Sequence, residues 1–406
     1  MKLIKCKKGV FFTMIAILMV AVIVAAATPK NQLVYKDRVS STQSRIGTAN
    51  NFAETLKAAY MPTALSTSSY SALNSLSEYV KVKGSLFADE AELSKAFTEM
   101  LMNGTVECSP GSHPTVEECI CGLQPGYPGC ASGAITLMKK SNLTQRIRDV
   151  EKAAGDALRL ETNISKDYGK FDVRVFQNDE TGPFQTGVNV AINYSINADI
   201  AWWNGTANIT AIFSIEGIED PMYSVKTRGL AQLAPDELYT NKINQSNITA
   251  WNVSSVFRQA DSRKYKHDEQ APSFLNRFTL SEQASACCGI ESLINPTSLP
   301  KLFDADGRGG TGGEARAYPD WCFLGAKCPP ETAGKLWKVS CVSKTTTGQK
   351  FYNLTLDSYH ASAYNLTGSE VPTDYIYSGD TDPHAAECDQ LMQEVCAIDP
   401  DTPCIP

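Results

Sequence analysis

The chain has 406 residues, 43% of them hydrophobic and 20% charged, which is enough for two or three domains with their own cores. Acidic residues outnumber basic ones by 44 to 37, and four of the lysines precede residue 28, so the rest of the chain is more acidic still. An acidic body argues against a nucleic-acid partner, and this composition argues against a cytoplasmic enzyme or a transporter with many membrane spans.

One long apolar run lies near the N-terminus. It covers residues 10–27 without a charge, and 18 helical residues rise about 27 Å, close to the bilayer core of about 30 Å. The lysines flank only its N-terminal side. The positive-inside rule therefore predicts a single-pass cell-membrane protein with a cytoplasmic N-terminus and residues 28–406 outside.

Three interpretations of this run predict different processing. The small residues 25–27 favour a cleaved secretory signal, whereas the length of the run favours an uncleaved signal anchor. The segment Lys7-Lys8-Gly9-Val10-Phe11-Phe12-Thr13 resembles the class III signal of type IV pilins and archaeal pilin-like proteins. That resemblance implies cleavage between Gly9 and Val10, a helix kept as membrane anchor, and self-assembly through this helix. The family prefers Glu at the position of Met14, and the missing glutamate argues against filament assembly more than against cleavage.

Helical patterns follow the apolar run. Residues 30–61 are polar with a sparse apolar repeat, which predicts a helical stalk rising from the bilayer. Apolar residues at helical spacing predict three more helices, over 68–82, 89–102 and 142–160.

Between the last two helices lies a segment rich in proline and glycine that contains Cys108, Cys119, Cys121 and Cys130. The segment has too little apolar surface to hold itself together, so two local disulfides are expected in an oxidising exterior. A zinc site with His113 is the alternative, but the paired C-x-x-C spacing of structural zinc sites is missing.

The pattern changes to period two in residues 171–175, 188–196 and 207–215. This alternation predicts a meander of about four antiparallel strands, with Asn208, Thr210 and Ser214 on its polar face and a turn at Asn204-Gly205. The neighbours Trp202 and Trp203 should point to opposite faces. The preceding helices can cover the apolar face, which gives an α+β fold.

Residues 236–406 show no sustained period and are expected to form a disulfide-stapled module with few regular elements. The predicted division is therefore 1–27 (tip and membrane helix), 28–165 (stalk and helices), 166–235 (sheet) and 236–406. The last part contains Cys287, Cys288, Cys322, Cys328, Cys341, Cys388, Cys396 and Cys404. Neighbouring cysteines rarely bond each other, so Cys287 and Cys288 are expected to bridge different segments. The central group has five of these cysteines and the tail has three. Because both numbers are odd, at least one disulfide must join the tail to the central group if every cysteine is oxidised.

Asparagine-x-Ser/Thr sequons are about three times as frequent as chance predicts, and their excess predicts a glycosylated surface protein. The eleven sequons begin at Asn103, Asn142, Asn163, Asn193, Asn204, Asn208, Asn244, Asn247, Asn252, Asn353 and Asn365.

Signals for chemistry are sparse. The four histidines, His113, His267, His360 and His384, lie in no metalloprotease or hydrolase motif, so no catalytic residue and no cofactor are predicted. A Gly-rich loop with Asp304, Asp306 and Glu314 is the best candidate for Ca²⁺, although it departs from the EF-hand spacing, and a plain loop is the alternative. The acidic tail from Glu370 onwards is interpreted as a solvated face, or else as a patch for cations or a basic partner.

Four further stretches, 213–223, 272–278, 288–293 and 356–360, are similar to recurrent segments of uncharacterised pilin-like membrane-anchored proteins from small-genome archaea. In the first of them, Asp220-Pro221 is interpreted as the end of a strand. The leading hypothesis is a non-enzymatic, anchored extracellular glycoprotein for adhesion or cell contact, with a surface partner on another cell. The alternatives are a secreted or anchored hydrolase and a small-ligand receptor or binding module.

Overall fold

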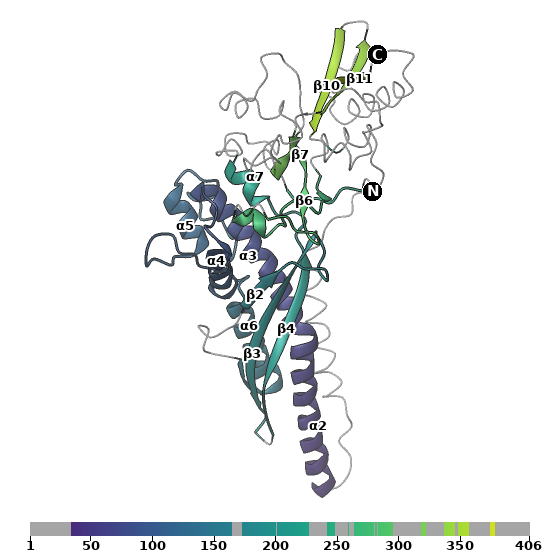
Figure 1. Cartoon of the computed structure of the whole chain (residues 1–406). Helices are drawn as coiled ribbons and strands as arrows, with labels where there is room; N and C mark the ends of the chain where they lie inside the picture. Colours follow the sequence, from purple (N-terminus) through teal and green to yellow (C-terminus); the bar gives the residue numbers. More distant parts are fainter. Residues whose placement is uncertain are drawn as a thin grey trace.

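The computed structural model describes part of the chain (Figure 1). The described residues are 34–164, 173–199, 201–226, 242–247, 259, 264–279, 281, 283–294, 318–321, 337–345, 348–356 and 374–377. Among these residues, no helix is long and apolar enough to cross a membrane. The apolar run over 10–27, with the processing residues Gly9 and Val10, lies outside them.

A single continuous helix begins the described chain. It consists of α2 (Val34–Thr55), the π turn η1 (Leu56–Tyr60) and α3 (Met61–Lys83), and the junction residues keep helical backbone angles. The stalk and the next helix were predicted as separate elements on either side of Pro62, and that separation is wrong. Proline has no amide hydrogen and its ring crowds the preceding turn, and the wider π turn directly before Pro62 accommodates both effects. The helix is about 75 Å long and ends at Gly84, whose φ is 72°.

Three shorter helices follow, each with a side-chain cap: α4 (Glu90–Asn103), α5 (Val116–Leu123) and α6 (Leu143–Leu158). The Asp89 carboxylate accepts a hydrogen bond from the Glu92 amide, and the Asn142 side chain accepts one from the Gln145 amide. The predicted helices over 89–102 and 142–160 are thus confirmed. Helix α5 lies inside the cysteine-rich segment, where no helix was predicted, although its capping box from Thr115 to Glu118 is visible in the sequence.

The sheet contains β1 (Glu161–Ile164), β2 (Val173–Phe176), β3 (Gln185–Asn197) and β4 (Trp202–Ser214). All pairings are antiparallel. Strand β4 pairs with β3 along its whole length, while β1 and β2 share the other edge of β3. The prediction of an antiparallel sheet of about four strands is confirmed.

The sheet has one buried and one exposed face. Alternate residues of β4 are buried or half-buried, while Asn208, Thr210 and Ser214 are exposed, as the period of two predicted. Trp203 packs against the core and Trp202 is 71% exposed, so the two rings do point to opposite faces.

The turn between β3 and β4 lies at residues 198–201 and not at Asn204-Gly205, so that prediction is wrong. The Ala198 amide donates to the Ala201 carbonyl at 3.0 Å, and Asp199 has a φ of 64°. Gly205 lies inside β4, directly across from Tyr194. A Cβ atom at position 205 would come within 3.2 Å of the Tyr194 hydroxyl, so the glycine makes room for this ring.

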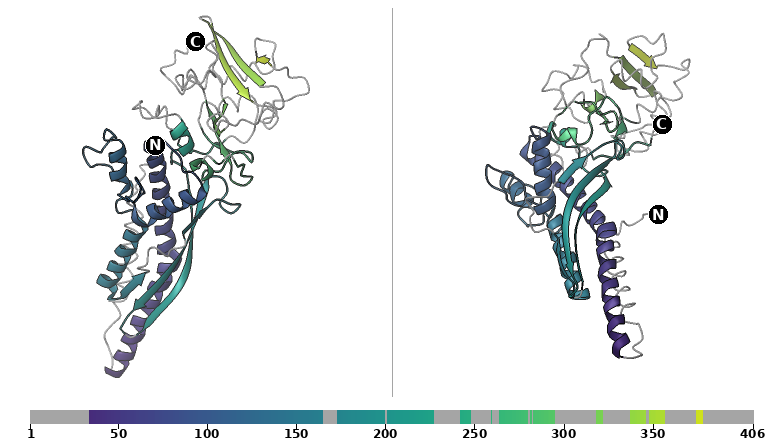
Figure 2. Two further views of the ribbon diagram at one scale, coloured as in Figure 1. Left: turned by 60° about the vertical axis from the view of Figure 1, so that its left-hand side comes forward. Right: turned by 60° about the horizontal axis from the view of Figure 1, so that its bottom comes forward.

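Helices cover the buried face of the sheet and share one core with it. Helix α3 packs against β4, α4 against β2 and α6 against β1. The start of α2 extends beyond the β3–β4 hairpin in every view (Figures 1 and 2). The arrangement is therefore α+β, with helices on an antiparallel sheet.

Two nine-residue strands within 337–356 go beyond the few regular elements expected for residues 236–406. From residue 221 to residue 321 the described elements are short. They are α7 (Pro221–Lys226), β5 (Lys266–His267), the 3₁₀ helix η4 (Asn276–Phe278), β6 (Ile290–Glu291), β7 (Leu293–Ile294) and β8 (Tyr318–Pro319). A second sheet contains β9 (Trp337–Thr345), β10 (Gly348–Leu356) and β11 (Asp374–Tyr377), with β9 in the middle. It lies at the end of the molecule opposite to the start of α2 (Figure 1).

Candidate functional site

A fully buried arginine joins segments that are far apart in the sequence. Arg277 in η4 is 0% exposed, and its Nη1 atom lies 2.5 Å from Asp220 Oδ2 and 2.7 Å from Asp320 Oδ2. Its Nη2 atom donates to the Ile290 carbonyl and to Asp320. The Tyr265 hydroxyl donates to Asp220 at 2.9 Å. Three of the four stretches singled out in the sequence, 213–223, 272–278 and 288–293, therefore meet at this arginine.

The electrostatics of this arginine cluster keep it charged. Burial disfavours the guanidinium, but Asp220 and Asp320 outweigh this effect and raise the pKa of Arg277. Burial also raises the pKa of Asp320 to about 6, although Arg277 acts in the opposite direction. The cluster thus holds one cation between two carboxylates, and within the described residues only the Nε atom of Arg277 lacks a partner in it.

Asp220 is also the last residue of the loop between β4 and α7. Its Oδ1 atom accepts hydrogen bonds from the amides of Met222 and Tyr223, in the first turn of α7. The prediction that a strand runs up to Asp220-Pro221 is wrong, because β4 ends at Ser214 and Pro221 begins a helix. Proline suits the first position of a helix, where its missing amide hydrogen is not needed.

Lys81 connects helix α3 to the stretch 213–223 through a largely buried ion pair. Lys81 of α3 lies 2.8 Å from Glu219 and 3.5 Å from Glu78, and the Tyr127 hydroxyl donates to Glu78. Although burial disfavours the charged form, the two glutamates raise the pKa of Lys81.

A second buried lysine, Lys266 of β5, lies 2.8 Å from Glu291 and 3.0 Å from Asp268. The indole nitrogen of Trp321 donates to Glu291 at 3.1 Å. The contacts of Lys266 join β5 to β6, and the loops around them are tied to the residues before α4, where the Phe87 amide donates to the Phe278 carbonyl at 2.9 Å.

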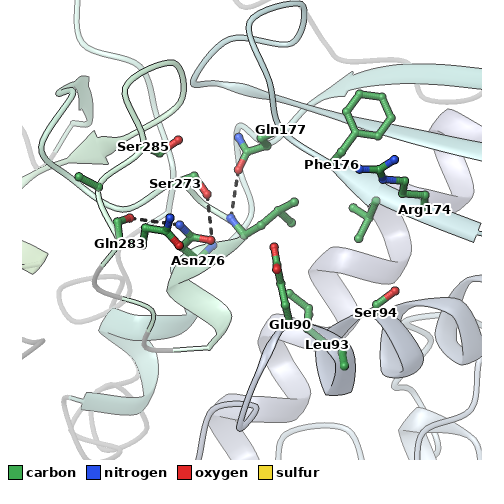
Figure 3. A pocket seen from close by; sticks show the side chains of 14 residues that line it. Glu90, Leu93, Ser94, Arg174, Phe176, Gln177, Ser273, Asn276, Gln283 and Ser285 are labelled. Atoms are coloured by element: carbon green, nitrogen blue, oxygen red, sulfur yellow. Dashed lines mark hydrogen bonds between the residues drawn. The ribbon is translucent and has the colours of Figure 1, made fainter.

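One of these loops forms a cleft with α4 and β2 (Figure 3). The cleft has a volume of about 680 Å³, within the range of small-ligand sites. One wall is the first turn of α4, the second is β2 with Gln177, and the third is formed by residues of 273–285. Glu90 extends from α4 into the space between the other two walls.

The cysteine-rich segment closes on two local disulfides, as predicted. Cys108 bonds Cys119, and Cys121 bonds Cys130. The second bridge closes the loop that contains Tyr127, which reaches Glu78 on α3. These bridges therefore hold a loop that contributes to the buried network.

Cys287 and Cys288 are bonded to each other, so the expectation that they bridge different segments is wrong. The pair lies in a tight loop in which the amides of Cys288 and Gly289 both donate to the Ser285 carbonyl. A Cβ atom at position 289 would lie 2.1 Å from the Asp268 carbonyl oxygen, so only glycine fits after this pair. Ser285, two residues before the disulfide, lines the cleft.

Sequons gather on the exposed face of the first sheet. Asn193, Asn204 and Asn208 are exposed on β3 and β4, and Asn163 is exposed on the adjoining β1. Asn103, Asn244 and Asn247 are exposed in other segments. Asn142 is half-buried, because it caps α6.

Where the structure describes them, the remaining predicted residues are not brought into a site. His113 contacts Glu99 at 2.9 Å and His267 contacts the Ala286 carbonyl at 3.1 Å. For Cys341 and Asn353 the structure describes only the strands β9 and β10 that contain them. The other predicted residues lie outside the described residues: Asn252, Asp304, Asp306, Glu314, Cys322, Cys328, His360, Asn365, His384, Cys388, Cys396 and Cys404.

The sequence interpretation missed the arginine cluster and the cleft. The visible signal for the cluster is Arg277, which lies close to Phe274, Leu275 and Phe278, where a charge that is buried with them needs a partner. Comparison of the chain with protein-family models, with characterised proteins and with solved structures finds no match.

Proposed function

We propose that this protein is a non-enzymatic surface glycoprotein that is anchored by residues 10–27 and displays its disulfide-stapled head outside the cell. Its role is pilin-like adhesion or contact with a partner on another cell. One observation carries the proposal: a continuous helix runs from Val34 to Lys83, and its start extends beyond the β3–β4 hairpin, which reaches the helix at Arg45. An apolar run that ends at residue 27 leaves only a few residues before this helix.

The surface of α2 supports a stalk. From Gln43 to Arg45 its side chains are polar and exposed, while Ala49 and Ala53 are buried. Arg45 pairs with Asp199 in the β3–β4 turn at 3.1 Å, which fixes the hairpin against the helix. A polar helix is suited to the space between a membrane and a head, whereas a filament core would need apolar faces.

The disulfides and sequons support the extracellular side. Disulfides persist in oxidising compartments, and two of the three described bridges staple a segment with little core of its own. Seven of the described sequon asparagines are exposed, as glycan attachment requires.

Surface labelling of intact cells tests this proposal. A membrane-impermeant, amine-reactive biotin should label the full chain on exposed lysines such as Lys139 and Lys140 before lysis. A variant with two charges in the apolar run, Leu18→Arg and Val22→Arg, should lose both membrane attachment and labelling. The matched control, Gln43→Arg and Ser44→Arg, places the same charges on exposed positions of α2 and should keep both. Labelling of the full chain only after lysis would contradict the proposal.

A further inference from the structure

The cleft between α4, β2 and residues of 273–285 runs along one edge of strand β2. Arg174, Val175, Phe176 and Gln177 all line it, although successive side chains of a strand point to opposite faces. Val175 lies on the buried side and is half-buried, while Arg174 is exposed on the other face. A space that touches both faces of one strand must run along the edge of that strand.

The opposite edge of β2 is already occupied. Residues Val173–Phe176 pair with Gly187–Val190 of β3, and within the described residues no strand pairs with the edge that faces the cleft. Along one edge of a strand every second residue points its amide and carbonyl outward, about 6.6 Å apart, while the others face the paired strand. Two of the four residues of β2 therefore offer backbone groups to a partner strand, along an edge of about 13 Å.

The far wall is held in place before any ligand binds. The Gln177 side chain accepts a hydrogen bond from the Leu275 amide at 3.0 Å and donates to the Gln185 carbonyl at 3.0 Å. Asn276 donates from its side chain to the Gln283 carbonyl at 3.2 Å. A preformed wall lowers the entropic cost of ordering the site on binding.

The cleft carries one charge of each sign. Glu90 extends into it from α4, and Arg174 lies on the β2 wall (Figure 3). Both side chains are exposed, and in the part of the chain that the structure describes neither forms a hydrogen bond or an ion pair from its side chain. A ligand with an acidic group opposite Arg174 and a basic group opposite Glu90 would complement both.

We propose that this cleft binds an extended peptide segment of another protein, which adds to β2 as a further strand. The backbone edge supplies affinity, as in other cases of strand addition, and the two charges select a peptide with one acidic and one basic side chain. This inference goes beyond the proposed anchoring and does not depend on it. A carbohydrate would use the side-chain amides and hydroxyls of the cleft without needing the strand edge.

The test is selection from a library of seven-residue linear peptides displayed on phage, against the full chain in detergent micelles. Enriched peptides should carry both an acidic and a basic residue. Synthetic copies should bind with a measurable Kd, and N-methylation of alternate backbone amides should weaken binding at least tenfold, because it removes the donors that a β-strand needs. Arg174→Gln and Glu90→Gln should each weaken binding about threefold, as for an exposed ion pair.

Two variants serve as controls. Ala91→Trp, at an exposed position that lines the cleft, should block binding without changing the thermal unfolding temperature. The double variant Glu90→Lys with Arg174→Glu should prefer peptides in which the two charges are exchanged. Three results would overturn the inference: no enrichment above the Ala91→Trp variant, full tolerance of N-methylation at every position, or binding of a neutral oligosaccharide in place of peptides.

Discussion

At the scale of single residues, Arg277 is the largest fully buried side chain among the described residues. It has no exposed surface and connects the loop before α7, the 3₁₀ helix η4, β6 and Asp320. A buried ion pair adds little net stability compared with apolar residues, but removal of one partner leaves the others charged and desolvated. Arg277 therefore matters because three segments depend on it at once.

Replacement of Arg277 by methionine should lower the free energy of unfolding by about 3–5 kcal/mol, because Asp220 and Asp320 would remain buried without their cation. Chemical denaturation measures this change. The matched control is Arg148→Met on the exposed face of α6, which should change the value by less than about 0.5 kcal/mol. Equal values for the two variants would show that the cluster does not hold the fold.

Asp320 should make stability depend on pH in an unusual direction. Burial raises its pKa to about 6, above the ordinary 3.8, so the folded state binds this proton more tightly than the unfolded state does. The stability that Asp320 contributes is therefore greatest near pH 4 and falls as the pH rises to about 6.

Comparison with Asp320→Asn, which cannot titrate, isolates this effect. The wild-type free energy of unfolding minus that of the variant should decrease by about 2 kcal/mol between pH 4 and pH 7. Denaturation at several pH values gives the curve. A difference that stays constant or increases with pH would mean that Asp320 ionises normally.

At the scale of elements, local sequence signals predicted several helices and strands. They could not predict which distant segments contact each other. Apolar spacing located α4 and α6, and the period of two located β3 and β4 together with the exposed Trp202. The pair Asn204-Gly205 misled, because a turn signal in the sequence does not decide where two long strands stop pairing. The partners of Arg277 could not be predicted, since they lie 43 and 57 residues away along the chain.

The disulfides should contribute unequally to stability. The Cys108–Cys119 bridge spans 11 residues, for which chain entropy gives about 3 kcal/mol, whereas Cys287–Cys288 closes no loop and should contribute less than about 1 kcal/mol. Paired alanine substitutions at each bridge, followed by denaturation, measure the two values. An equal loss from both pairs would contradict the entropic account.

At the scale of the whole molecule, the parity of the cysteines still requires a long-range bridge. With Cys287 bonded to Cys288, three central cysteines and three tail cysteines remain, and both numbers are odd. If all twelve cysteines beyond the apolar run are oxidised, one of Cys388, Cys396 and Cys404 must bond to one of Cys322, Cys328 and Cys341. The shortest such loop, from Cys341 to Cys388, spans about 47 residues and would stabilise the fold by about 4 kcal/mol.

Peptide mapping without reductant checks this bridge. A peptide from the tail should remain attached to one from the central group until reductant is added. Release of every tail peptide without reductant, or a free thiol in each group, would disprove the premise that all twelve are oxidised.

The central claim is that residues 10–27 hold an extracellular head on the membrane through the helix that starts at Val34. Extraction of membranes from cells that express the full chain tests it most directly. Because the apolar run is long enough to span the bilayer core, the protein should stay in the membrane pellet through washes with high salt and dissolve only in detergent. Release of the intact chain by salt alone, without proteolysis, would contradict the account.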